Sequence, residues 1–435
     1  MRANRKKRWM AAGLCVTLLF LAAGCGNQKE TSEHQEVLDG TSMDQNQVEP
    51  ETVNLMEGIE SLGIDMTDEL PDVPIMKFGL PLFQNVLKEA GEGENVLVSP
   101  LSAITALYMT YFGAEGDTGK QMGNVLGKGM ESYLNDYATN LPQGEAYKVN
   151  LANGIWFKQV PQLHVKEKFL QYNKNFFQAS AYQAPFNEDT LKEINAWVAE
   201  QTDGMIPQIL DEITERDVIF LINALSFDAE WQNIYQQHEV WNDIFTTESG
   251  EEQLVSMLHS NEQLYLEDEL ATGFVKYYKD QKYAFVALLP KDGVRVAEYV
   301  EGLTAEHLKE LLGSPEHTTV EVTLPKFTTE YSITLNEILA RMGMPDAFSE
   351  TDADFSRMAT YDNANIYISK VLQKTFISVD ERGTRAGAAT AVAMANKMMA
   401  LETKVVNLNR PFVYLLVECE HNEPLFMGTL MDAEQ

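Results

Sequence analysis

Three runs of strand length that are apolar at nearly every position constrain the fold of this chain most strongly. They cover residues 218–227, 283–289 and 412–419. Such runs predict strands that are buried on both faces, because a strand with one solvated face would alternate apolar and polar residues. The chain has 435 residues, 45% of them hydrophobic, which is enough apolar surface to cover large sheets.

Shorter patterns predict the elements around these runs. Further strands are expected at residues 149–157, 318–324 and 425–430, with two extended runs within 364–379. Helices are expected at 76–90, with Pro81 in the first turn, at 100–112 with Ser99 or Ser102 as cap, at 194–200, and at 334–342, ended by Gly343. Residues 51–73 are compatible with either a short helix or a loose segment.

The order of these elements indicates the fold class. Helices dominate the first half and strands the second, with little strict β–α–β alternation, so we expect an α+β protein with large, mostly antiparallel or mixed sheets. Length alone favours two domains.

The N-terminus is typical of an exported protein. Five basic residues lie within residues 2–8, and the apolar stretch 10–23 is shorter than the roughly twenty residues of a membrane span. The stretch ends in Ala22, Ala23, Gly24 and Cys25, which resembles a bacterial lipobox whose cysteine is lipidated, although the family prefers Leu where Ala22 stands. An ordinary cleaved signal is the alternative. The polar residues after Cys25 predict a flexible spacer.

Charge and cysteine content limit the possible partners. The formal net charge is −32, and removal of the basic leader makes the body still more acidic. Such a body repels nucleic acid phosphates and anionic lipid headgroups, so we expect no nucleic acid partner. Outside the leader region only Cys419 remains, predicted to be a small buried hydrophobe, so no disulfide framework is expected.

The chain shows no enzyme motif. Gly-x-Ser-x-Gly and His-Glu-x-x-His are both absent, and the seven histidines have no metal-ligand spacing. Residues 116–120 resemble a phosphate loop, but Ala114 and Gln121 stand where glycine and a hydroxyl residue are required, so a turn is predicted. We therefore expect no catalytic residues, no metal and no cofactor.

Residues 379–399 are the most informative stretch for function. Small residues follow an acid, a base and a glycine, and at period two Thr384, Ala386, Ala388, Thr390 and Val392 share a face with nothing bulky enough to block insertion into a sheet. Composition alone favours an alanine-rich helix, and a flexible linker is a second alternative.

Short motifs in a fixed order decide between these alternatives. Together they resemble the serpin family over nearly all of residues 75–430, at 95–102, 113–122, 152–156, 194–198, 202–206, 223–231, 324–327, 342–348, 353–356, 381–384, 410–412 and 424–428. The resemblance implies one domain with three β-sheets, eight to nine helices and an exposed reactive-centre loop. It also implies a suicide-substrate inhibitor of a serine protease, whose loop is cleaved and inserts into the main sheet while the protease is held as an acyl-enzyme.

The resemblance assigns roles to particular residues. The reactive bond is expected between Lys397 and Met398, which implies a trypsin-like target; a shifted register would use Met398 or Met399 and favour chymotrypsin- or elastase-like targets. The hinge comprises Glu381, Gly383, Thr384, Ala386, Gly387, Ala388, Ala389 and Thr390. The region where the sheet parts comprises Ser99, Ser102, Asn223, Trp231 and Gln373. Gln373 stands where the family often has histidine; it can still donate and accept, without a response to pH.

The expected organisation is a signal peptide at 1–24, an acidic polar tether at 25–74 and a single serpin domain at 75–435. We expect a monomer in the cell envelope, lipid-anchored at the membrane surface and facing the extracellular side, whose partner is the target protease. A non-inhibitory serpin is the nearest alternative, but such members tend to carry bulky, charged or proline residues facing inward in the hinge. A solute-binding lipoprotein or a secreted hydrolase is less consistent with the pattern.

Overall fold

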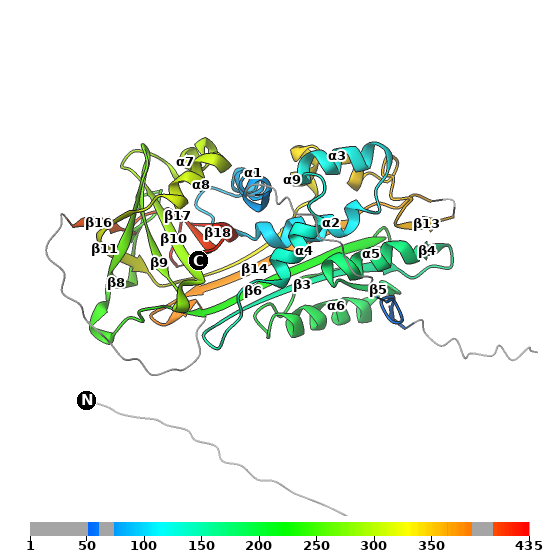
Figure 1. The fold of residues 1–435 in the computed structure, drawn as a ribbon, viewed down its shortest axis with the longest axis horizontal. Coiled ribbons are helices and arrows are strands. Elements are labelled where there is room, and N and C mark those ends of the chain that lie inside the picture. The colour runs from blue at the N-terminus through cyan, green and yellow to red at the C-terminus, as the bar shows by residue number, and fades with distance from the viewer. Residues whose placement is uncertain (1–50, 61–73, 363, 385–402, 435) are drawn as a thin grey trace, which may run out of the picture. The chain divides into compact units, whose positions relative to one another are not determined.

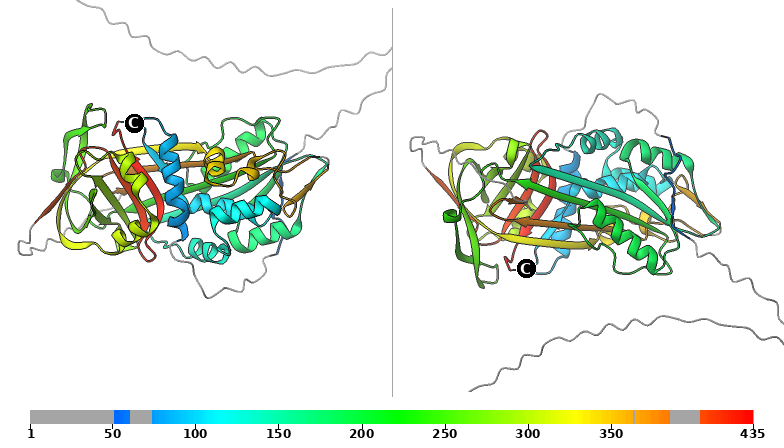
Figure 2. Two further views of the ribbon diagram at one scale, coloured as in Figure 1. Left: turned by 90° about the horizontal axis from the view of Figure 1, so that it is seen from above. Right: turned by 90° about the horizontal axis from the view of Figure 1, so that it is seen from below.

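A seven-stranded sheet runs through the body, with helices on both of its faces (Figures 1 and 2). The structure is a computed structural model that describes residues 51–60, 74–362, 364–384 and 403–434. The strand order is β1 (Val53–Asn54), β5 (Ser180–Ala184), β3 (Tyr147–Lys158), β6 (Ile219–Glu230), β15 (Gly383–Thr384), β14 (Lys370–Val379) and β12 (Phe327–Thr334).

Two further sheets complete the β structure of the described residues. The larger has nine strands: β16 (Lys404–Asn407), β11 (Glu316–Pro325), β8 (Glu252–Glu267), β9 (Ala271–Tyr277), β10 (Tyr283–Pro290), β17 (Phe412–Glu418), β18 (Glu423–Leu430) and β2 (Val96–Val98), with β7 (Val240–Thr246) on β8. The smaller pairs β13 (Ala359–Tyr361) with β4 (Leu163–Val165). Antiparallel pairings predominate, and β6–β14, β3–β5 and β11–β16 are parallel, which confirms the expected α+β class with mixed sheets.

Nine α-helices surround the sheets in the described part of the chain. They are α1 (Pro74–Glu89), α2 (Pro100–Tyr111), α3 (Gly116–Leu126), α4 (Glu131–Thr139), α5 (Glu167–Phe177), α6 (Glu188–Gln201), α7 (Val296–Gly302), α8 (Ala305–Gly313) and α9 (Asn336–Met342). Three short 3₁₀ segments are η1 (Gln237–Glu239), η2 (Lys279–Gln281) and η3 (Pro345–Phe348). None of the helices within these ranges is long and apolar enough to cross a membrane.

Strand β6 is buried on both faces, as its apolar run predicts. Leu221 and Leu225 belong to the main core, which also contains α2, while Phe220 and Ile222 belong to a second core beneath α6. Ile194 and Val198 of α6 close that second core. Because both faces of β6 are packed, any change beside this strand affects the centre of the protein.

Several local expectations are wrong. Pro81 lies well inside α1 rather than in its first turn, and residues 116–120 start helix α3 instead of forming a turn. The first part of 364–379 is not a strand, and Thr334 ends β12 before α9 begins. Tertiary packing and the following sequence override local turn and helix signals at these positions.

Residues 51–60 lie against the body. Residues 51–60 form a strand and a turn rather than a helix, and β1 pairs with β5 at the edge of the seven-stranded sheet. Leu55 donates its N–H to Ala181 over 2.8 Å, and Thr52 donates to Glu193 of α6. The described residues belong to one compact unit that begins at Pro50.

Candidate functional site

The boundary between β6 and β14, here called the seam, is the place where Gly383 and Thr384 of the expected hinge enter the sheet. In its lower part these strands pair directly and in parallel, from Phe220 opposite Lys370 to Ala224 opposite Lys374. At the end near Glu230, called the upper end, the two-residue strand β15 already lies between them and pairs antiparallel with both. The seam therefore contains a third strand at its upper end, whereas β6 and β14 pair directly with each other at its lower end.

Gly383 fits the upper end because it lacks a side chain. A Cβ atom at this position would lie 1.9 Å from the carbonyl oxygen of Ala229, so any larger residue would push β15 away from β6. Thr384 follows with its side chain buried, in the inward orientation that the period-two pattern predicts. Its hydroxyl lies 2.5 Å from the Tyr278 hydroxyl, one of which donates to the other.

An aromatic pair holds the backbone of the hinge. Trp231 stacks on Tyr278 with ring centroids 4.4 Å apart, and both side chains are fully buried. The Trp231 indole N–H donates to the carbonyl of Asp380 over 2.8 Å, and its backbone N–H donates to that of Arg382 over 2.8 Å. The position of Trp231 at the top of the sheet agrees with the expectation from sequence, whereas Tyr278 was not predicted.

Glu381 is fixed from two sides. Its carbonyl accepts from the backbone N–H of Tyr235 over 2.9 Å, and its carboxylate forms a 2.5 Å ion pair with Lys326. The hydrogen bond from Lys326 lowers the pKa of Glu381 below its ordinary value of 4.5. The hinge therefore starts from a turn attached to both β6 and the loop before β12.

Two separate hydrogen-bonded pairs lie in the middle of the seam. Gln373 of β14 donates its amide to the Ser99 carbonyl over 2.9 Å and accepts from the Ser99 N–H over 3.1 Å. Asn223 of β6 donates instead to Asn153 of β3. Gln373 and Asn223 are opposite each other in register, but each bonds away from the seam. Gln373 thus attaches β14 to the start of α2.

Ser99 and Ser102 have structural roles beside the seam. The Ser99 hydroxyl accepts from the N–H of Ser102 and caps α2, as predicted. The Ser102 hydroxyl and the side-chain amide oxygen Oδ1 of Asn223 are buried with no hydrogen-bond partner among the described residues.

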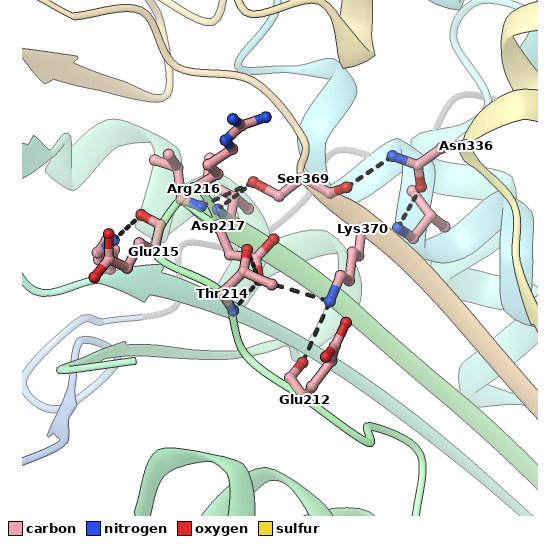
Figure 3. A network of polar contacts seen from close by, with 12 residues as sticks. Glu212, Thr214, Glu215, Arg216, Asp217, Asn336, Ser369 and Lys370 are labelled. Atoms are coloured by element: carbon pink, nitrogen blue, oxygen red, sulfur yellow. Dashed lines mark hydrogen bonds and ion pairs between the residues drawn. The ribbon is translucent and has the colours of Figure 1, made fainter. Parts of the chain in front are cut away.

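The lower end of the seam is closed by a polar clasp that the sequence did not predict (Figure 3). The Ser369 hydroxyl accepts from the N–H groups of Val218 and Ile219 over 2.8 and 3.5 Å. Lys370 lies 3.6 Å from the Asp217 carboxylate and donates to the Glu212 carbonyl over 3.2 Å. These contacts join the loop before β6 to the first residues of β14.

The clasp extends to both flanking segments. Asn336 donates to the Ser369 carbonyl and accepts from the Val371 N–H, and Thr214 donates to Asp217 through both its backbone N–H and its hydroxyl. The only sequence signal is the polar pair Ser369 and Lys370 directly before an apolar strand. That signal does not reveal a partner 150 residues earlier.

Some expected site residues lie outside the described residues. These are Cys25, the small hinge residues Ala386, Gly387, Ala388, Ala389 and Thr390, and the reactive-bond residues Lys397, Met398 and Met399. Among the described residues, no group of histidine, cysteine and acidic side chains could hold a metal ion. Cys419 is half-buried, and burial raises the pKa of its thiol to about 12.

Comparisons with known proteins agree with this geometry. A sequence model of the serpin (serine protease inhibitor) family matches residues 74–433. Serpin B8 of Homo sapiens is 32% identical over 369 residues, covering 81% of this chain and 96% of the relative. Serpin B10 of Sorex araneus is 31% identical over 383 residues, covering 80% and 95%.

Solved structures add a comparison of conformations. One match is the crystal structure of a thermophilic serpin, tengpin, in the native state, whose sequence is 40% identical. The superposition has a TM-score of 0.84 and covers 88% of this chain and all of that chain. Tengpin in the latent state is 41% identical, with a TM-score of 0.74 over 84% of this chain and all of that chain. The body is therefore more similar to the native form of that protein than to its latent form.

Proposed function

Because the chain belongs to the serpin family, whose members are protease inhibitors and not enzymes, we propose that it is an inhibitory member that traps serine proteases as a suicide substrate. The observation that carries this proposal is the seam. Gly383 and Thr384 already lie between β6 and β14, and after Arg385 the residues from Ala386 to Ala391 are small.

The geometry favours insertion of the loop in one direction. The target protease attacks the reactive bond and forms an acyl-enzyme on its own serine. The loop behind Thr384 then continues antiparallel to β6, away from Glu230 and towards Ile219, replacing the direct pairing of β6 with β14. Roughly a dozen new backbone hydrogen bonds, at about 1 kcal/mol each, give a driving force on the order of 10 kcal/mol before ordering costs.

Specificity follows from the residue at the reactive bond. Lys397 before the bond supports a trypsin-like target, because an acidic specificity pocket pairs with a lysine ammonium. Use of Met398 or Met399 instead would favour chymotrypsin- or elastase-like enzymes. The small residues at Ala386 and Ala388 support inhibition over the non-inhibitory alternative, because bulky or charged residues there would obstruct insertion.

The N-terminal sequence supports export and lipid attachment through Cys25. The proposed mature protein is a monomer held at the outer face of the membrane by a polar tether. Replacing Cys25→Ser should move the protein from the membrane fraction to the soluble fraction of the same cells. A chain that stays in the membrane fraction after this change would contradict the anchor.

The test of inhibition is incubation of the purified protein with trypsin and, separately, with elastase, followed by denaturing gels. A boiling-resistant band near the summed masses, together with lost protease activity, is the expected result. Sequencing of the released C-terminal peptide identifies the reactive bond, with Met398 expected as its first residue. Clean cleavage by both enzymes, with both still active and no such band, would contradict the proposal for these enzyme classes.

A further inference from the structure

A buried ion pair lies directly behind the residues that hold the hinge. The Lys276 ammonium of β9 is 2.7 Å from the Glu262 carboxylate of β8, and the two residues are 2% and 9% exposed. Burial alone would lower the pKa of Lys276, but Glu262 and Tyr235 together outweigh it, so the pKa lies above its ordinary value. Lys276 is therefore held as an ammonium group inside the core.

The pair is connected to two aromatic side chains. The Lys276 ammonium lies 4.4 Å from the ring centroid of Tyr235 and 5.4 Å from that of Trp231, within the range of cation–π attraction. Ser260 donates to Glu262 over 2.6 Å and lies 3.3 Å from the Tyr235 hydroxyl. A single charged group thus fixes the positions of both rings.

These aromatic residues are the ones that bind the hinge. Tyr235 and Trp231 donate their backbone N–H groups to the carbonyls of Glu381 and Arg382, and the Trp231 indole donates to that of Asp380. The backbone of both residues, and the ring of Trp231, are therefore bonded directly to the start of the loop.

Stability does not account for the pair. A buried ion pair is often no more stabilising than apolar residues of the same volume, because both charges lose their hydration. The pair loses hydration and contacts the rings of Trp231 and Tyr235 beside the hinge. A need to keep these two residues in place explains it better.

We propose that Lys276 and Glu262 are positioning residues for loop insertion, which hold Trp231 and Tyr235 where they keep residues 380–384 at the upper end of the seam. This inference rests on the proposed inhibitory function. Accurate placement lets the cleaved loop insert before water releases the acyl-enzyme. The pair thereby sets how many inhibitor molecules are consumed for each protease molecule inactivated.

The test uses the double variant Lys276→Met/Glu262→Gln, which removes both charges at similar volume and leaves no buried ion unpaired. The matched control is Tyr299→Phe, which removes a part-buried 2.9 Å hydrogen bond to Asp268, in the turn between β8 and β9. We expect the double variant to consume several-fold more inhibitor per trypsin inactivated than the control, with a comparable unfolding temperature. Lys276→Arg, which keeps the charge, should lie closer to the wild type.

A second measurement separates positioning from general loosening. A synthetic peptide with the sequence of residues 384–397 competes with the hinge for the seam, so it should anneal faster to the double variant while the protein's own loop inserts more slowly. The positioning role would be overturned if both processes became faster in the double variant. It would also be overturned if the double variant consumed no more inhibitor per trypsin inactivated than Tyr299→Phe does. If the wild type traps no protease, the proposed function fails, and peptide annealing alone still decides this inference: equal rates in wild type and double variant would overturn it.

Discussion

The two ends of the seam differ in composition and in state. The upper end is occupied by Gly383 and Thr384 and is surrounded by large aromatic side chains, with Trp231 stacked on Tyr278. At the lower end of the described structure, no third strand lies between β6 and β14. Polar contacts through Ser369 and Lys370 there join the loop before β6 to the start of β14. The upper end guides a strand that enters, whereas the lower end resists separation of the strands that are already paired.

This difference indicates where the barrier to insertion lies. At the top, β15 already lies between the strands, so an entering loop has no direct pairing of β6 with β14 to break there. Hydrogen bonds at the bottom are directional, and breaking them leaves buried donors unpaired. Insertion therefore starts easily and is limited by the opening of the middle and lower seam.

The largest effect is expected at the top, from Thr384→Arg. A charged side chain at this fully buried position costs several kcal/mol, so the hinge leaves the seam and the loop cannot insert. The variant should be cleaved quantitatively by a protease that the wild type traps, with no covalent band on a denaturing gel. The control is Thr328→Arg on the exposed face of edge strand β12. Trapping that equals that of the wild type would refute guidance by the upper end.

A smaller effect is expected in the middle, from Gln373→Ala. This change leaves the buried N–H of Ser99 without its partner, at about 1–3 kcal/mol, whereas the Ser99 carbonyl still accepts from the N–H of Ala103. Calorimetry of the uncut protein should show a lower unfolding temperature. An unchanged midpoint would mean that Gln373 does not attach β14 to α2 in solution.

At the lower end, Ser369→Ala should cost about 1 kcal/mol in the uncut protein, because Val218 loses its acceptor. Full insertion separates β6 from β14 at this place, so the loop-cleaved form should lose less stability than the uncut form. The measurement is the pair of unfolding temperatures before and after cleavage of the loop. Equal losses in both forms would show that the clasp survives insertion and does not oppose it.

The smallest effect is expected from acid. The folded-state pKa of Glu381 is lowered, so its ion pair with Lys326 contributes above the ordinary pKa of 4.5 and is lost as pH falls through the lower folded value. Both side chains are partly exposed, so the effect is modest. The protein should become more prone to peptide annealing below about pH 4, and Glu381→Gln should remove that dependence. A wild-type rate that does not vary over this range would contradict the prediction.

Sequence predicted the upper end of the site better than the lower end. Gly383, Thr384 and Trp231 were identified because the hinge motif and the motif at 223–231 are local patterns. Tyr278, Asn153 and the Ser369 clasp were missed because each acquires its role from a strand that is distant in sequence. The three apolar runs gave the correct buried strands, but Pro81 and residues 116–120 show that local signals fail where tertiary packing decides.

Lys276 is a special case among the missed residues. A single lysine within the apolar strand 271–277 is a visible anomaly in the sequence. Its partner Glu262 belongs to the neighbouring strand, and its relation to the hinge appears only when β9 is placed beside Trp231. Charged residues in otherwise apolar strands therefore merit a search for partners before any role is assigned.

The register of the seven-stranded sheet also has a consequence for transport. Strand β1 is level with Ile219 and Phe220, whereas the hinge lies beside Glu230, about 35 Å away along β6. Under the proposed mechanism, a protease carried by the inserting loop would end near β1, at the opposite end of β6 from the hinge. In the proposed lipid-anchored protein, the trapped enzyme would then remain attached to the membrane instead of diffusing away.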